Sequence, residues 1–463
     1  MTSISSHQAL EPKYRLLVFL VSIGFFMQAL DTTIVNTALA AMAKDLQQDP
    51  LHMHGMVVAY VLSVAVCIPL SGWLADRFGV RNTYFAAIII FTLASLGCGL
   101  AQNFDQLIIF RVIQGIGGAL LLPIGRLAML KIIPRSQFLS AMSLMSLAGL
   151  LGPLMGPTLG GWLVEVATWH WIFLINIPMG ILGMLVTFKA MPNTKEATVK
   201  AFDFLGFFLL VIAMVGLSLG IEQASNQQNS MWISIALVLM GLIASGCYAY
   251  HSHTHKNALF RSNLFQNKIY AIGIIGNFFA RFGGNAMPFL MPLMLQVAFG
   301  FEPFITGLLM IPTVLGSLAS KPLVRPLIQR FGYRKILIIN TILVGICIAS
   351  FALSTAETPV WLRATHFFIF GLINSLQFVS MNTLTLKDLS QQDASSGNSF
   401  LSMIMMLSMS IGVALAGTLI NVFTQYYGGS DITTAFHSTL ICLGLINIIT
   451  LCIFWRIPKS TTV

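Results

Sequence analysis

The sequence predicts an all-α polytopic membrane protein with about 14 transmembrane helices. Of the 463 residues, 56% are hydrophobic and 9% are Asp, Glu, Lys or Arg, against roughly 25% charged residues in an ordinary soluble domain. The mean hydropathy is +0.84, and apolar runs of membrane-crossing length follow one another along the chain. This composition argues against soluble enzymes, nucleic-acid-binding proteins and secreted disulfide scaffolds.

Each expected span is an apolar stretch that can cross about 30 Å of hydrocarbon at about 1.5 Å per residue, and it ends at a short polar or Pro/Gly-rich connection. The first span is too long for the core of a signal peptide, so we expect it to be retained. In chain order, the expected spans cover residues 15–42, 55–75, 83–101, 107–130, 138–164, 171–191, 204–221, 231–250, 269–299, 304–328, 335–354, 361–386, 396–424 and 435–455.

Basic residues are distributed unevenly between alternate loops. With the first terminus on the inner face, about 18 of the 25 Lys and Arg residues lie on that face. The opposite face holds Lys44 and several acids, among them Asp105 and Glu302. The positive-inside rule therefore predicts a multi-pass protein of the cytoplasmic (inner) membrane with both termini in the cytoplasm. The formal net charge of +10 reflects this orientation, and we expect no nucleic-acid partner.

Short motifs recur along the chain at a spacing of about 255 residues, which indicates an internal duplication. Arg77-Phe78-Gly79 recurs as Arg330-Phe331-Gly332, and Leu130-Lys131 recurs as Leu386-Lys387. The spacing leaves room for two extra helices between the halves. The predicted organisation is a cytoplasmic segment at 1–14, a six-helix bundle at 15–191, a two-helix insertion with cytoplasmic flanking loops at 192–268, a second six-helix bundle at 269–455 and a cytoplasmic tail at 456–463.

Asp31 is the one acidic residue inside the expected spans. A carboxylate in hydrocarbon is costly unless it is paired, protonated or hydrated, so Asp31 is a candidate functional residue. The helical rise places it about 24 Å from the inner end of its span, and Arg111 lies at a similar height. Burial favours the protonated carboxyl and a neighbouring arginine favours the carboxylate, so a conformational change could load and release a proton. A permanent structural salt bridge is the alternative.

Other polar side chains inside the expected spans could contact a substrate. Arg281 lies near the membrane midplane, and it gives the expected cavity a neutral to positive potential. An anionic metabolite, such as citrate or a carboxylate metal chelate, is therefore an alternative substrate to a lipophilic drug. The candidate cavity residues are Gln28, Asn36, Gln114, Arg281 and Gln296.

Gly152, Gly156 and Gly160 recur every four residues on one face of the fifth expected span. Such a stripe of small residues lets two helix backbones approach closely. Pro157 lies in the same stretch and favours a bend. Static packing is the alternative to a role in gating.

Several segments resemble the major facilitator superfamily and, within it, the fourteen-span drug:proton antiporter branch. The segment from Gly72 to Arg81 is similar to the signature loop of the superfamily, and two segments, His52-Met53-His54 and Met381–Asp388, look like the MdtD-type subgroup. The match runs from about residue 15 to 458. The segments similar to the antiporter branch are Leu30–Leu39, Arg111–Gly118, Gly152–Gly161 and Trp169–Pro178.

The resemblance implies the major facilitator fold and proton-coupled efflux of small molecules or drugs by alternating access, with a facilitator or importer of the same fold as the alternative. It implies proton coupling by Asp31 and Arg111. It also implies a gating loop that forms a charge latch between the halves, and an antiporter helix that forms a flexible seal. The loop residues are Gly72, Asp76, Arg77, Gly79 and Arg81, and the helix residues are Gly152, Gly156, Pro157, Gly160 and Gly161.

We expect no enzymatic activity and no cofactor. No phosphate-binding loop, His-Glu-x-x-His motif or nucleophile elbow occurs, so a proton gradient and not ATP is expected to drive the cycle. His251, His253 and His255 alternate without a Cys or a second set of ligands, and we expect no metal site there. The expected partners are a small-molecule substrate, protons and the lipid bilayer, and the chain is expected to act as a monomer.

Overall fold

The computed structural model describes residues 10–196, 199, 201–224, 231–255, 257–390, 393–428 and 431–458. Every regular element in these ranges is helical, and 12 of the described helices are long and apolar enough to cross a membrane. The predicted all-α membrane fold is therefore confirmed. The predicted terminal segments 1–14 and 456–463 lie partly outside the described residues.

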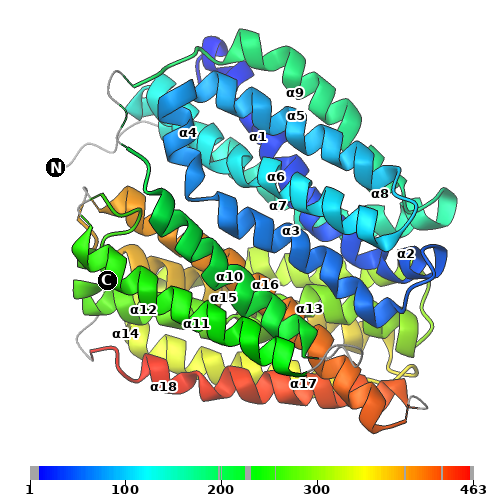
Figure 1. Ribbon diagram of the computed structural model, residues 1–463. Helices are drawn as coiled ribbons and strands as arrows, with labels where there is room; N and C mark the ends of the chain where they lie inside the picture. The colour runs from blue at the N-terminus through cyan, green and yellow to red at the C-terminus, as the bar shows by residue number, and fades with distance from the viewer. Residues whose placement is uncertain are drawn as a thin grey trace.

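The first half of the chain forms a bundle in the upper part of Figure 1. Local signals set its helix bounds. The side chain of Asn103 accepts a hydrogen bond from the backbone N–H of Gln106 at 2.9 Å and starts α6, and Gly79, with a φ of 89°, separates α4 from α5. The elements are α1 Pro12–Ile34, η1 Val35–Thr37, α2 Leu39–Asp45, η2 Pro50–Met53, α3 His54–Cys67, α4 Leu70–Phe78, α5 Val80–Gly99, α6 Phe104–Ile132, α7 Arg135–Val166, α8 Trp171–Leu174 and α9 Asn176–Ala190.

The last part of the chain forms a second bundle in the lower part of Figure 1. Gly332 has a φ of 74° and a ψ of 159°, close to the φ of 89° and ψ of 150° of Gly79, so the repeated Arg-Phe-Gly motif has the same backbone geometry in both bundles. The elements are α12 Lys268–Phe279, α13 Phe282–Leu293, η4 Met294–Ala298, α14 Pro303–Ser350, η5 Phe351–Leu353, α15 Val360–Leu386, α16 Ala394–Tyr426, α17 Ile432–Ile449 and α18 Leu451–Phe454.

The number of candidate spans differs from the predicted fourteen for two reasons. The expected span 269–299 is interrupted at Ala280 and Arg281, which leaves α12 and α13 with 12 residues each. The element α14 contains two expected spans, because its helical hydrogen bonding continues past the non-helical Gly332. Twelve candidate spans are therefore found in the described residues, and the count of fourteen stays a prediction.

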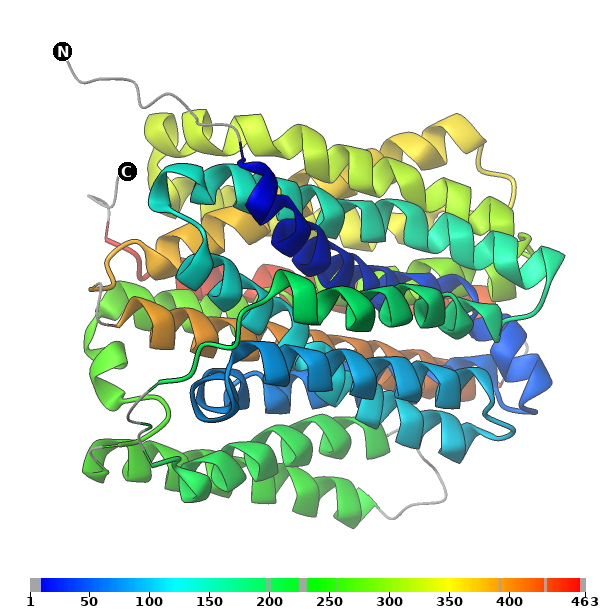
Figure 2. The same ribbon diagram turned by 90° about the horizontal axis from the view of Figure 1, so that it is seen from above.

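Two helices lie between the bundles in the sequence, α10 Phe204–Gln223 and α11 Met231–Thr254, followed by the short η3 Ser262–Gln266. Figure 2 shows α10 and α11 side by side at one edge of the molecule. A Cβ added to Gly216 would lie 3.0 Å from the Cα of Gly241, so small residues allow this close approach. Apolar side chains of α10 pack against both α3 and α16, including Met214, Leu62 and Met403.

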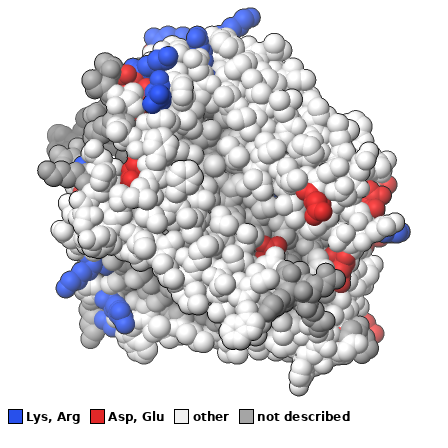
Figure 3. Space-filling view, viewed as in Figure 1, with Lys and Arg blue, Asp and Glu red and all other residues white. Residues whose placement is uncertain are grey.

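Two ends of the molecule can be distinguished. We call the end where α1 begins and α15 ends the terminal side, and the end where α1 ends and α6 begins the distal side. On the face in Figure 3, Lys and Arg side chains gather toward the terminal side, whereas most Asp and Glu side chains lie toward the distal side. The basic residues thus gather on the side where the positive-inside rule predicts them.

Candidate functional site

Asp31 of α1 and Arg111 of α6 form an ion pair inside the N-terminal bundle. Nη1 of Arg111 lies 2.6 Å from Oδ2 of Asp31. The side chains are 0% and 1% exposed, so water does not screen this pair. The sequence placed both residues at a similar height, and in the structure they do meet.

Amide and hydroxyl groups surround the Asp31 carboxylate. Gln114 donates from Nε2 to Oδ1 of Asp31 at 2.8 Å and to Oγ of Ser95 at 2.8 Å. Asn176, in the first turn of α9, donates from Nδ2 to the same carboxylate oxygen at 3.3 Å. Helices α1, α5, α6 and α9 thus each contribute a polar side chain to one buried network.

The guanidinium of Arg111 is also held by groups that carry no charge. Its Cζ lies 4.1 Å from the ring centroid of Tyr60 and 5.7 Å from that of Phe173, distances at which a cation is attracted to an aromatic face. Nη1 also donates to Oε1 of Gln114 at 2.6 Å. Loss of the carboxylate charge would therefore leave Arg111 with weaker partners inside the same pocket.

Sequence reasoning missed Ser95, Tyr60 and Asn176. Asn176 lies in the segment Trp169–Pro178 that was matched to the antiporter branch, and that position could have marked it. Ser95 and Tyr60 carry no such signal, because an isolated Ser or Tyr in an apolar helix is common.

The five predicted cavity residues do not meet at one place. Gln114 belongs to the Asp31 network, as described above. Gln28 of α1 and Asn36 of η1 each lie about one turn from Thr32, on opposite sides of it along the chain. Each keeps a buried side-chain oxygen without a hydrogen-bond partner among the described residues. Both oxygens can therefore still accept a hydrogen bond.

Arg281 is held within the C-terminal bundle. Its Nε donates to Asn277 and its Nη2 to Asn382, both at 2.9 Å. The Cζ lies 3.6 Å from the ring centroid of Phe378, and the side chain is 4% exposed. Neutral amides and an aromatic ring thus surround the guanidinium, and a role of Arg281 in a substrate cavity stays a prediction.

Gln296 connects the bundles. Its Nε2 donates to the backbone oxygen of Thr37 at 2.9 Å. Close to it on the distal side, the backbone N–H of Phe304 donates to Glu165 at 2.8 Å, and Oγ1 of Thr158 donates to the backbone oxygen of Gly307 at 3.4 Å. The bundles are therefore closed against each other on the distal side.

Asp76 of the predicted gating loop faces its own bundle. Its carboxylate lies 3.9 Å from Nζ of Lys131, which also lies 2.7 Å from Glu196, and its backbone oxygen accepts from the N–H of Glu196 at 3.3 Å. Burial raises the pKa of Asp76, and Lys131 opposes this rise. Of its described partners, Lys131 lies in the N-terminal bundle and Glu196 in the segment that follows it. None lies in the C-terminal bundle, so the predicted latch between the bundles is not formed in this conformation.

The other loop residues have separate places. Arg77 lies over the ring of Trp73 at 5.1 Å, and Arg81 lies over Phe188 at 5.1 Å. A Cβ added to Gly79 would collide with the side chain of Asn193, and the positive φ also requires glycine there. Gly72 has open space around it.

The glycines of α7 permit two different close contacts. Gly152, Gly156 and Gly160 pack against α1, where a Cβ on Gly152 would lie 2.7 Å from the backbone of Ala29. Gly161 faces the other bundle, at Pro303. Pro157 accepts a hydrogen bond at its backbone oxygen from Oγ1 of Thr37 at 3.1 Å. The predicted stripe thus joins α7 to α1, and its distal end lies at the contact between bundles.

Arg363 of α15 is a third buried arginine, after Arg111 and Arg281, and sequence reasoning missed it. It is 2% exposed, and its Nη2 donates to the backbone oxygen of Thr355 at 2.8 Å. Its Nε and Nη1 have no hydrogen-bond partner among the described residues, and Phe301 lies 4.7 Å from its Cζ. The spacing from Arg111 is close to the repeat of about 255 residues, which could have identified it as the counterpart of Arg111.

Comparison with known proteins gives a family match over most of the chain. The profile described as Major Facilitator Superfamily matches residues 21–250 and 273–462. Proteins of Salmonella newport (strain SL254) and Salmonella typhi, whose name MdtD refers to multidrug resistance, are each 48% identical over 449 residues, which cover 96% of this chain and 95% of the relative.

Solved structures show the same fold at low identity. The peptide transporter POT in complex with sulfate has a TM-score of 0.71 at 15% identity and covers 99% of this chain and 98% of its own. A bacterial homologue of the human lysosomal transporter Spinster, solved in an inward-facing and unoccupied conformation, has a TM-score of 0.67 at 13% identity and covers 96% and 97%.

Proposed function

The chain belongs to the major facilitator superfamily, and from this membership we propose that it exports small molecules, drugs among them, across the cytoplasmic membrane in exchange for protons. The observation that carries the proposal is the buried pair of Asp31 and Arg111. A carboxylate that is closed to solvent in one conformation is suited to binding a proton in another. The name of the relatives, which refers to multidrug resistance, supports drugs as substrates.

The proton step uses the Asp31 carboxylate. A proton from the distal side binds a carboxylate oxygen and removes the negative charge that Arg111 and Gln114 engage in the present structure. Breaking such a buried pair costs about 3–5 kcal/mol. A shift from 1:99 to 99:1 between two conformations needs about 5.5 kcal/mol. The free energy that protonation of Asp31 makes available is therefore large enough to account for most of this shift between conformations.

The conformational step opens the contact on the distal side. In the present structure Gln296 and Glu165 contribute hydrogen bonds between the bundles at that side. Rocking one bundle against the other would break them and open the space between the bundles to the distal side. The close α7 contacts at Gly160 and Gly161 lie at the same place and support a role of this helix in gating.

The orientation follows the loop charges. We assign the terminal side to the cytoplasm, since Lys and Arg gather there, and the molecule is then closed toward the outside. We assign drug recognition to uncharged groups, with Gln28 and Asn36 offering hydrogen-bond acceptors. An anionic substrate is not favoured, because the relatives are named for multidrug resistance.

The test is transport by the full-length chain in proteoliposomes with an imposed pH gradient and a fluorescent lipophilic cation. Asp31→Asn is expected to abolish gradient-driven transport while binding of the cation remains measurable. Asp105→Asn is the matched control, because Asp105 is exposed at the start of α6. Full coupled transport by Asp31→Asn would overturn the proposal, and gradient-independent uptake by the unmodified chain would favour a facilitator.

A further inference from the structure

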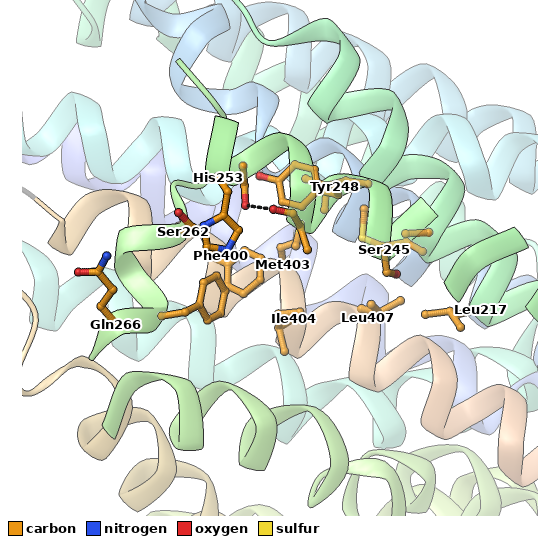
Figure 4. Close-up of a pocket in the computed structure, with 16 residues that line it drawn as sticks. Leu217, Ser245, Tyr248, His253, Ser262, Gln266, Phe400, Met403, Ile404 and Leu407 are labelled. Carbon is orange, nitrogen blue, oxygen red and sulfur yellow. Dashed lines mark hydrogen bonds between the residues drawn. The ribbon is translucent and has the colours of Figure 1, made fainter. Parts of the chain in front are cut away.

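Two adjoining cavities lie where the hairpin of α10 and α11 meets the C-terminal bundle, and Figure 4 shows the larger one. The larger one has a volume of about 520 Å³. Its walls are mainly apolar, with Leu210 and Met214 from α10, Ala249 from α11, and Met403 and Leu407 from α16. An open apolar groove on the membrane-facing edge of a protein is suited to a hydrocarbon chain.

The smaller cavity is polar and has a volume of about 300 Å³. It shares Ser252, His253 and Ser262 with the apolar groove, so the two form one continuous surface. Arg261 and His255 complete the charged or titratable part of its lining. The polar cavity lies at the end of α11 and the start of η3, on the terminal side.

Asp203, which contacts His251 of α11, is already engaged by other groups. Asp203 is 7% exposed. It accepts hydrogen bonds from Nε2 of His251 at 2.9 Å, from the backbone N–H of Gly206 at 2.9 Å and from that of Leu259 at 3.2 Å. It contributes no lining to either cavity. Arg261 is exposed and makes the mouth of the groove positive, which is complementary to an anionic headgroup.

The depth of the groove fits an amphipathic molecule that lies along the membrane normal. From Ser252 at the mouth to Ser245 inside, α11 advances by about 10 Å at about 1.5 Å per residue. The polar mouth and the apolar walls thus follow the order of a headgroup and an acyl chain in the leaflet on the terminal side.

We propose that this groove binds an anionic phospholipid of that leaflet, with one acyl chain between α10, α11 and α16 and the phosphate at Arg261. The site is separate from the Asp31 network, and the inference does not depend on proton-coupled export. At the mouth, Ser262 and His253 can donate hydrogen bonds to the phosphate oxygens, whereas the hydroxyl of Ser252 donates to the backbone oxygen of Ala249 at 2.9 Å.

The experiment is native mass spectrometry of the purified full-length chain, titrated with dioleoyl phosphatidylglycerol or dioleoyl phosphatidylcholine. Removing one cation near a membrane surface is expected to weaken binding by about fivefold, so Arg261→Gln should lower the affinity for phosphatidylglycerol by that factor. The affinity for phosphatidylcholine should fall by less, because its choline ammonium offsets the phosphate charge. Lys335→Gln, at an exposed basic residue elsewhere on the terminal side, should change neither affinity.

A second variant tests the apolar part of the site. Ala249 is exposed in the groove wall, so Ala249→Phe can fill the groove without disturbing the core, and it should weaken binding of both lipids. Glycerol phosphate, which has no acyl chain, should fail to displace bound phosphatidylglycerol. Equal affinities in Arg261→Gln and Lys335→Gln, displacement by glycerol phosphate, or displacement by a lipophilic cation with no effect of Arg261→Gln would each overturn the proposal.

Discussion

Nη1 of Arg111 bridges Oδ2 of Asp31 and Oε1 of Gln114, with 2.6 Å to each. One nitrogen thus joins the charged and the neutral parts of the network. A change of charge at Asp31 would therefore alter the hydrogen bonds of Gln114, Ser95 and Asn176, because these residues are linked in one network.

Two of the buried arginines, Arg111 and Arg363, should respond differently to the same substitution. Arg111→Met leaves the Asp31 carboxylate buried without its cation, which costs about 3–5 kcal/mol. Arg363→Met removes a guanidinium that bonds to backbone carbonyls, and the loss should stay below about 3 kcal/mol. Thermal unfolding in detergent, followed by tryptophan fluorescence, should show the larger fall in Tm for Arg111→Met. Adding Asp31→Asn to Arg111→Met should restore part of the loss, and equal falls for both arginines would contradict this account.

Two glycines in helices should tolerate alanine very differently. The Cβ of Gly152→Ala would lie 2.6–2.7 Å from atoms of Ala29 and Leu30, and two backbones cannot separate without loss of packing, so Tm should fall. Gly72→Ala meets nothing within 4 Å, and higher helix propensity should leave stability unchanged or raise it by up to about 1 kcal/mol. Measuring the Tm of both variants checks this prediction. An unchanged Tm for Gly152→Ala would show that α7 and α1 do not pack as closely as the structure indicates.

The contact on the distal side can be weakened at one residue. Gln296→Leu removes a hydrogen bond to Thr37, a loss of about 1 kcal/mol that corresponds to about a fivefold shift toward the outward-open state. Hydrogen exchange of peptides from 157–166 and 300–310 should then become faster. Gln425→Leu is the control, because Gln425 is an exposed residue near the same side. Unchanged exchange in Gln296→Leu would show that other contacts dominate the closure.

The pH dependence of stability should change when Asp76 is replaced. In the folded protein, burial raises the pKa of Asp76 above its ordinary value of 3.8. As the pH rises, Asp76 therefore loses its proton in the unfolded chain before it does so in the folded protein. Stability therefore falls as the pH rises through the window between 3.8 and the higher folded value. Asp76→Asn should remove this contribution. Tm profiles between about pH 4 and pH 7 check the direction, and a profile in Asp76→Asn that is as steep as in the unmodified chain would refute it.

Much of the helix order followed from hydropathy alone, because each span must be apolar over the thickness of a bilayer. The break at Arg281 did not. Hydropathy records only how apolar a stretch is. The break lies in the backbone at Ala280 and Arg281, where Asn277 and Asn382 hold the side chain of Arg281 in place.

The ion pair was predictable, but the network around it was not. Asp31 and Arg111 are charges in an apolar setting, so they stand out in the sequence. Ser95 and Asn176 become partners only because α5 and α9 turn particular faces toward α1, and rotation of a helix about its axis depends on packing with several neighbours. Gln114 was assigned to the cavity for the same reason.

The place of α10 also has a mechanical consequence. Ser218 and Ile221 of α10 form hydrogen bonds with Ser410 and Thr418 of α16, whereas the packing of α10 against α3 includes the apolar side chains of Leu62 and Ala65. When the bundles rotate, the hairpin would travel with the C-terminal one, and the slip plane would run along α3. Flexible methionine side chains such as Met214 and Met403 can keep that surface filled while the helices slide.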